Sequence, residues 1–279
     1  MYVMIEVAIA VLAGLLIGSF LNVCIFRLPR DLSVVRPRSF CPGCEKMIVW
    51  YDNIPVVSYI LLGGRCRHCK ERIPIRYPLV EIATAASFGI CVAALGASLA
   101  ALKYCIFSAI LITLIASDME ERILPDEFTL GGTVVGLILA IFVPMEGPGE
   151  MSFTRLFLPA SLDWRWRSLA ESALGAGLSC ALIWFVGWAY QKIRHREGLG
   201  FGDVKMIAMI GAFLGLQSAL LTLIAASLLG SVGGLAYIFL TGRDFSTYEL
   251  PFGSFLGLAA LAVAMFGEVV VVWYSRVSR

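Results

Sequence analysis

Long, nearly uncharged apolar runs are the feature that most constrains how this chain can fold. The first covers residues 4–26 and contains a single acid, Glu6, near its start. About 20 apolar residues suffice for a helix to cross the hydrocarbon layer of a membrane. Seven further runs follow, at 79–97, 99–117, 128–143, 168–190, 204–216, 219–240 and 252–273. The pattern predicts an all-α polytopic membrane protein with about eight transmembrane helices.

Composition excludes several other classes of protein. Apolar residues make up 59% of the 279 residues and charged residues only 15%, against about 25% charged in an average soluble domain. A soluble globule of this size could not bury so much apolar side chain. The net charge of +2 suggests no nucleic-acid partner. A cleaved signal peptide is the alternative for the first run, but that run lacks a basic start and is too long.

The runs at 204–216 and 219–240 are separated only by Gln217 and Ser218. The first of the two is short for a full crossing of the membrane. A single bent or re-entrant helix is therefore the alternative to two separate spans in this region.

Lysines and arginines are distributed unevenly between the loops. With eight spans, 16 of the 22 basic residues lie on one side of the membrane. They are found in the segments 27–78, 118–127, 191–203 and 241–251, with Lys205 at the membrane edge. Loops rich in Lys and Arg remain in the cytoplasm. The distribution predicts a cytoplasmic location for the long polar segment 27–78 and places both termini outside.

Four of the eight cysteines form two C-x-x-C pairs in the polar segment. Cys41 and Cys44 precede Cys66 and Cys69, with 21 residues between the pairs. Each short pair can turn both sulfurs toward one ion, so two pairs predict a structural zinc site with four thiolates. A redox-active pair is the alternative, disfavoured because two pairs lie in a reducing compartment. The other cysteines lie in apolar runs, where packing is their expected role.

Two aspartates interrupt the apolar pattern at the ends of predicted spans. Asp118 follows the run 99–117, and Asp203 opens the run 204–216 after a glycine-rich stretch. Two carboxylates that share a proton can activate a water and protonate a carbonyl oxygen. The helix dipole disfavours negative charge on Asp118, at a C-terminal end, and favours it on Asp203, at an N-terminal start. Helix capping or a solvated loop is the alternative for both aspartates.

Further motifs, taken in order, resemble those of the type IV prepilin peptidases, the bifunctional leader peptidase/N-methyltransferases. The resemblance extends from Gly18 to about Gly257 and rests on GSFLNVCIFRLP from Gly18, the two cysteine pairs, DNIP at 52–55, RYPLVE at 76–81, Asp118 with Leu124-Pro125, and GFGDVK at 200–205. The last motif resembles the G-x-G-D signature of intramembrane aspartyl proteases. The principal departure is Ser117, where many relatives carry Thr, and this exchange keeps the hydroxyl group.

The resemblance implies both a site and a reaction. Asp118 and Asp203 would cleave the basic leader from a type IV prepilin or a type II secretion pseudopilin. Cleavage would follow a Gly, at the cytoplasmic face of a bacterial inner membrane. The new N-terminal residue, commonly Phe, would then be N-methylated with S-adenosylmethionine in the zinc-binding segment. Polar residues of the motifs would contact this methyl donor or pack the segment onto the spans: Asn22, Asp52, Asn53, Arg76 and Glu81. No G-x-G-x-x-G motif follows a strand, so a Rossmann site is not supported.

With the resemblance, the chain divides into a first helix at 1–26, a zinc-binding domain at 27–78 and a seven-helix peptidase core at 79–279. We hypothesise that acids near the start of the core attract the basic leader, with a solvated acidic loop as the alternative. The candidate leader contacts are Glu120, Glu121, Asp126, Glu127 and Lys205. The sequence leaves open which prepilin or pseudopilin is the substrate and whether copies of the chain form a homo-oligomer.

Three other functional classes compete with this interpretation. A transporter needs polar residues inside its spans to line a path, and these spans contain almost none. A purely structural assembly protein has no use for two carboxylates beside a glycine-rich backbone. A peptidase without methyltransferase activity is distinguished only through the zinc-binding domain, whose cysteine pairs are intact here.

Overall fold

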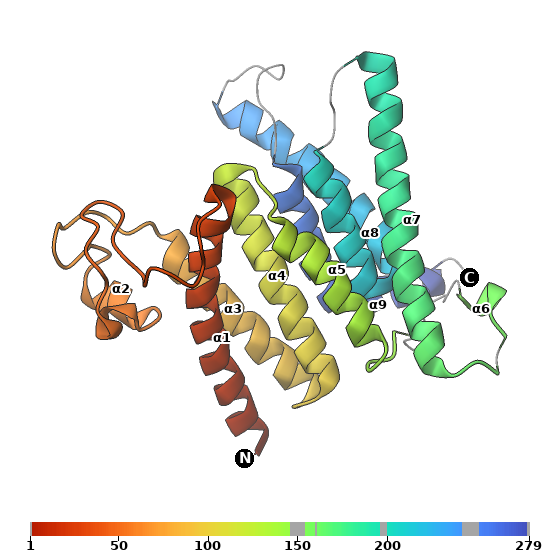
Figure 1. Cartoon of the computed structure of the whole chain (residues 1–279). Coiled ribbons are helices and arrows are strands. Elements are labelled where there is room, and N and C mark those ends of the chain that lie inside the picture. The colour runs from red at the N-terminus through yellow and green to blue at the C-terminus, as the bar shows by residue number, and fades with distance from the viewer. Residues whose placement is uncertain (1, 146–153, 160, 196–199, 242–250, 278–279) are drawn as a thin grey trace. The chain divides into compact units, whose positions relative to one another are not determined.

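Helices account for nearly all of the regular structure in this computed structural model, which describes residues 2–145, 154–159, 161–195, 200–241 and 251–277 (Figure 1). Within those ranges, β pairing is limited to two isolated bridges. The chain divides into two compact units, Met1–Glu121 and Arg122–Arg279. The predicted all-α class is confirmed.

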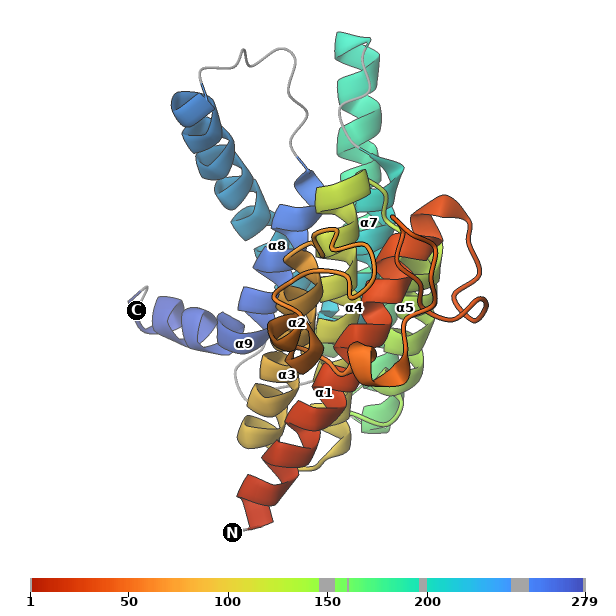
Figure 2. The same ribbon diagram turned by 90° about the vertical axis from the view of Figure 1, so that its left-hand side faces the viewer.

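The first unit contains three long helices and a looped segment between the first two. The long helices are α1 (Tyr2–Arg27), α3 (Arg76–Leu95) and α4 (Leu99–Glu121), and each packs against the other two. The looped segment carries the short helices η1 (Leu28–Arg30), η2 (Trp50–Asn53) and α2 (Val57–Leu61). It lies to one side of the long helices in Figure 1 and in front of them in Figure 2.

Two glycines on one face of α1 let its backbone lie almost against the backbone of α3. A Cβ on Gly14 would lie 2.6 Å from the Cα of Ala85, and one on Gly18 would lie 2.7 Å from the Cα of Glu81. Small residues four apart are a recurrent means of close helix packing in membranes, where association depends on van der Waals contact. The contact fixes the position of α1 along the axis of α3.

The second unit is organised around its longest helix. Helix α8 (Phe201–Thr241) packs against α5 (Asp126–Ala140), α7 (Trp164–Arg194) and α9 (Phe252–Val277), and the short α6 (Thr154–Phe157) contacts α7. Glycines again permit the closest approach, because a Cβ on Gly175 of α7 would lie 2.4 Å from the carbonyl oxygen of Gly211 in α8.

Helix α8 contains both predicted runs, 204–216 and 219–240, and its backbone is interrupted near the boundary between them. At Gly215 the backbone angles (φ 80°, ψ 175°) are not helical, so α8 consists of two helical segments joined at a kink. Residues with a side chain rarely adopt this positive φ. Glycine adopts it readily because it has no Cβ, so Gly215 permits the break. The sequence predicted two helices here, with one bent or re-entrant unit as the alternative, and the structure shows two helical segments that meet at this kink.

Five described helices are long and apolar enough to cross a membrane: α1, α3, α4, α7 and α8. This count is lower than the eight predicted because two runs share α8, α5 has only 15 residues, and α9 qualifies only as a shorter apolar helix over Phe252–Gly267. The other six runs each correspond to one helix. The predicted loops at 191–203 and 241–251 lie partly outside the described residues.

We expect Gly14→Ala to destabilise the first unit by about 1–3 kcal/mol, because the added methyl group overpacks a backbone contact. Gly177→Ala is the matched control, since a Cβ on this glycine of α7 meets nothing within 4 Å. That change should be neutral or stabilise by up to about 1 kcal/mol. Thermal unfolding of both variants in detergent checks the pair, and equal stability would contradict the close packing of α1 on α3.

Candidate functional site

The two cysteine pairs adopt the same local fold. In the first, Phe40 and Met47 form an isolated bridge, and the amide of Glu45 donates to the carbonyl of Cys41 at 2.8 Å. In the second, Arg65 and Arg72 form the bridge, and the amide of Lys70 donates to the carbonyl of Cys66 at 3.1 Å. Each turn therefore points both of its sulfurs to one side.

The four sulfurs converge as the sequence predicted. The ligand atoms of Cys41, Cys44, Cys66 and Cys69 all lie within 4.8 Å of one another. Amides of Cys69 and His68 donate to the Cys66 sulfur and lower the pKa of its thiol to about 7, whereas burial raises the pKa of the Cys41 thiol. The cluster could hold a metal ion, since thiolates are ligands for soft and borderline metals.

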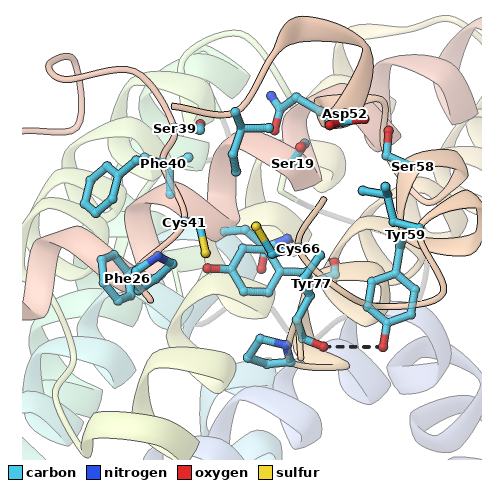
Figure 3. Close-up of a pocket in the computed structure, with 18 of the residues that line it drawn as sticks. Ser19, Phe26, Ser39, Phe40, Cys41, Asp52, Ser58, Tyr59, Cys66 and Tyr77 are labelled. Atoms are coloured by element: carbon cyan, nitrogen blue, oxygen red, sulfur yellow. Dashed lines mark hydrogen bonds between the residues drawn. The ribbon is translucent and has the colours of Figure 1, made fainter. Parts of the chain in front are cut away.

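A cavity of about 430 Å³ lies in the first unit, bordered by α1, the looped segment and the start of α3 (Figure 3). The side chains around it include Ser19, Cys41, Asp52 and Cys66. Part of the four-cysteine cluster therefore belongs to its wall. All five polar residues proposed from the sequence as methyl-donor contacts line this cavity: Asn22, Asp52, Asn53, Arg76 and Glu81. The sequence predicted the members of the set, and the fold brings them together.

Two buried polar atoms of residues in this wall have no hydrogen-bond partner among the described residues. The amide nitrogen of Asn22 donates to the carbonyls of Gly18 (3.2 Å) and Tyr77 (3.0 Å), which leaves its Oδ1 unpartnered. The Nε of Arg76 is also unpartnered, while its Nη1 bonds the carboxylate of Glu120. A buried polar atom without a partner is costly. Both residues line the first cavity, and these two atoms are themselves buried.

The acids of the wall differ in how they are held. Arg67 binds Asp52 through two hydrogen bonds of 2.6 and 2.7 Å, which lower the pKa of the Asp52 carboxyl. Arg76 binds Glu120. Glu81, only 7% exposed, instead accepts from the amide of Val56 at 2.7 Å and from the hydroxyl of Ser19.

Val56 occupies a strained turn. Its backbone angles are φ 61° and ψ −48°, and the amide of Val57 donates to the carbonyl of Pro55 at 2.6 Å. This is a γ-turn of the rare hand, which a β-branched residue adopts only at a cost of about 1–3 kcal/mol. The bond to Glu81 ties this turn to α3.

A second cavity of about 370 Å³ lies next to the first along α1 and shares several lining residues with it. Its wall includes Leu16, Phe20 and Trp50, which are exposed apolar side chains, and the buried Arg27. The guanidinium of Arg27 donates to backbone carbonyls of the looped segment. Ser19 lines both cavities.

The two aspartates lie at helix ends, as the sequence predicted. Asp118 is in the last turn of α4, in the first unit, and is 6% exposed. Asp203 is in the first turn of α8, in the second unit, and its amide donates to the carbonyl of Gly200 at 3.1 Å. Leu124 packs on the same turn, 3.1 Å from where a Cβ of Gly202 would lie.

Three of the acids proposed as leader contacts are held by basic side chains, which the sequence analysis missed. Glu121 pairs with Arg30 and Glu120 with Arg76 in the first unit. Asp126 pairs with Lys205 in the second unit, with contacts of 2.7 and 2.9 Å. Glu127 lies in the first turn of α5.

Sequence reasoning also missed Ser19, Arg30 and Arg67 as residues of the first cavity. Ser19 and Arg30 lie in or beside the first motif, which offered a signal. Arg67 lies between the second pair of cysteines, and only its fold reveals the bond to Asp52.

Comparison with known proteins identifies the family. The model of the bacterial peptidase A24 N-terminal domain matches residues 12–95, and that of the type IV leader peptidase family matches residues 105–235. A prepilin leader peptidase/N-methyltransferase of Pseudomonas putida is 31% identical over 284 residues, which cover 94% of this chain and 91% of that protein. This chain belongs to the type IV leader peptidase family.

A second relative in this family, the prepilin leader peptidase/N-methyltransferase of Myxococcus xanthus, is 38% identical over 230 residues. These residues cover 82% of this chain and 62% of that protein, so the matched part is less than two thirds of the relative's length. No solved structure matches the chain. The family resemblance inferred from the motifs is confirmed.

We expect the double variant Cys41→Ser/Cys44→Ser of this family member to lose nearly all bound metal and to unfold at lower temperature, because half of the thiolate ligands are removed. Elemental analysis by mass spectrometry and thermal unfolding measure the two effects. Cys180→Ser, in α7 and outside the cluster, is the control and should retain its metal. Full metal content in the double variant would contradict a metal site at this cluster.

Proposed function

We propose that this chain cleaves the leader peptide from a prepilin or pseudopilin and then N-methylates the new N-terminus. Membership of the type IV leader peptidase family is the observation that carries the proposal. Curated relatives named prepilin leader peptidase/N-methyltransferase support both activities over most of the chain. Mass spectrometry of a prepilin co-expressed with the chain tests the proposal, with cleavage and the methyl increment scored separately.

The enzyme acts at a membrane. We place it in the bacterial inner membrane, with the polar segment and the sites in the cytoplasm, because basic loops remain on that side. The basic leader of the substrate would then reach the enzyme from the cytoplasm, and its apolar helix would lie in the bilayer. The proposed division of labour gives methylation to residues 27–78 with the first helix at 1–26, and peptide cleavage to the core at 79–279.

Zinc is the metal that best suits the cluster. Four thiolates satisfy its tetrahedral preference and leave no position for water or substrate, which is typical of structural sites. Such an ion would stabilise a looped segment whose described residues contain only short helices. Its role would be to hold the wall of the first cavity in place.

The first cavity is the proposed site of S-adenosylmethionine, which supplies a methyl group on a positively charged sulfur. Its volume of about 430 Å³ lies within the usual range for small-molecule sites. The unpartnered Oδ1 of Asn22 suits the ammonium group of the donor's amino-acid part, and the unpartnered Nε of Arg76 suits its carboxylate. Asp52 and Asn53 add polar groups to the same wall.

Peptide cleavage is assigned to Asp118 and Asp203. The negative end of the α4 dipole lies at Asp118 and the positive end of the α8 dipole at Asp203, so negative charge is more favourable on Asp203. Asp203 would accept a proton from the attacking water, and Asp118 would donate one to the scissile carbonyl oxygen.

Asp118→Asn and Asp203→Asn should each reduce leader cleavage by at least about 100-fold, since each removes one partner of the acid–base pair. Methylation of a peptide supplied already cut should remain close to that of the unaltered enzyme. Gel assays of cleavage and mass spectrometry of the pre-cut peptide measure the two activities. Cleavage that survives in either variant would exclude that aspartate from the chemistry.

Leader recognition is assigned to acids close in sequence to Asp118: Glu120, Glu121, Asp126 and Glu127. Lys205 pairs with Asp126. Arg30 and Arg76 already neutralise part of this charge. We infer that basic leader residues exchange with these partners, which favours basic leaders without leaving carboxylates unpaired in the free enzyme. Such surface interactions weaken as salt rises.

The exchange of partners can be tested with a charge swap. Glu121→Arg should raise the KM for a basic leader several-fold and leave the KM for a neutralised leader unchanged. The double variant Arg30→Glu/Glu121→Arg restores an ion pair but puts the positive charge where the leader would bind. If Glu121 attracts the leader, the double variant keeps a raised KM. Recovery of the normal KM would show that only the ion pair matters.

A further inference from the structure

N-methylation requires a proton transfer in addition to binding of the methyl donor. The amine that leader cleavage exposes is an ammonium over most of the neutral range, since α-amino groups have pKa values of about 7.7–8.0. An ammonium has no lone pair with which to attack a methyl group. A residue that accepts its proton must therefore lie where the amine meets the methyl donor. This inference rests on the proposed function.

Glu81 is the acid of the cavity wall best suited to accept this proton. Its carboxylate is 7% exposed, and within the described part of the chain it forms no ion pair. Asp52 and Glu120 are already held by arginines. A buried carboxylate without a cation is costly to keep charged. Accepting a proton from an ammonium removes both buried charges at once.

The surroundings of Glu81 fix the carboxylate while leaving it a path for the proton. The amide of Val56, in the strained γ-turn, donates to its Oε2 at 2.7 Å. The hydroxyl of Ser19 also bonds the carboxylate, and Ser19 lines both the first and the second cavity. A hydroxyl can donate to the charged carboxylate and accept from the protonated one. Strained backbone of this kind concentrates at functional sites.

We propose that Glu81 is the catalytic base of N-methylation. One N–H bond of the ammonium breaks, its electron pair stays on nitrogen, and the proton passes to a carboxylate oxygen of Glu81. The nitrogen lone pair then forms the new N–C bond with the methyl group, while the S–C bond breaks and its electron pair stays on the sulfur. The positive charge of the sulfonium moves to the methylated amine, and Glu81 releases its proton to solvent.

The test uses the full-length enzyme, a pre-cut peptide with a free N-terminal amine, and Glu81→Gln. The amide oxygen of Gln can still accept from Val56, but it cannot take a proton at neutral pH. The methylation rate of the variant should then be proportional to the fraction of the N-terminal amine that is neutral. Its rate should rise about tenfold per pH unit below pH 7.7, from about 50-fold slower than the unaltered enzyme at pH 6 to near equality at pH 9.

Glu45→Gln is the matched control, because it makes the same change at an exposed residue of the looped segment outside the cavity. Its pH profile should match that of the unaltered enzyme. Leader cleavage, which is assigned to other residues, should be unchanged in Glu81→Gln. A loss of methylation that is equal at every pH, or a normal rate at pH 6, would overturn the proposal.

Asn22→Ala separates this inference from the cofactor site on which it rests. If the cavity holds the methyl donor, this variant should bind S-adenosylhomocysteine about tenfold more weakly, because a buried hydrogen bond is lost. Unchanged binding would refute the assignment of the cavity. The role of Glu81 would still be decided by the pH profile, which does not depend on where the donor binds.

Discussion

The close backbone contact of α1 with α3 determines where the polar groups of the first unit lie. Gly14 and Gly18 remove the side chains that would separate the two helices. Ser19 and Asn22, within one turn of Gly18, thereby come within hydrogen-bonding reach of Glu81 and of the carbonyl of Tyr77. In a membrane, where apolar surfaces do not drive helices together, such contact and these bonds are the main sources of attraction.

The looped segment completes the cavity that this contact begins. Two cysteine turns bring four sulfurs together, and Cys41 and Cys66 of this cluster line the cavity with Asp52 and Glu81. Side-chain bonds also join the segment to the helices, among them Arg27 to the carbonyls of Ser33 and Pro37, and Glu81 to the amide of Val56. A metal ion at the cysteines would therefore stabilise a binding wall rather than take part in the chemistry.

Charge pairing separates acids that the sequence could not distinguish. Asp52, Glu120, Glu121 and Asp126 each face a basic partner, whereas the buried Glu81 is held by a backbone amide and a hydroxyl. A paired carboxylate stays charged and serves for attraction or support. A carboxylate held only by neutral donors is better suited to exchange a proton.

Much of this protein could be predicted from the order of its residues. The apolar runs predicted the helices because membrane crossing depends on length and hydrophobicity, which are local properties. The spacing of the cysteines predicted their cluster, since two turns with two sulfurs each have few other uses. Asp118 and Asp203 were located at helix ends because each follows or opens an apolar run.

The tertiary structure decided what depends on contact between distant segments. Whether 204–216 and 219–240 form one helix or two depended on the backbone of Gly215, which a hydropathy pattern does not encode. The pairing of Arg67 with Asp52, the unpartnered atoms of Asn22 and Arg76, and the isolation of Glu81 from cations also arise only when the chain folds. A sequence specifies which charges exist, but the distances between them, on which electrostatic energy depends, are set by packing.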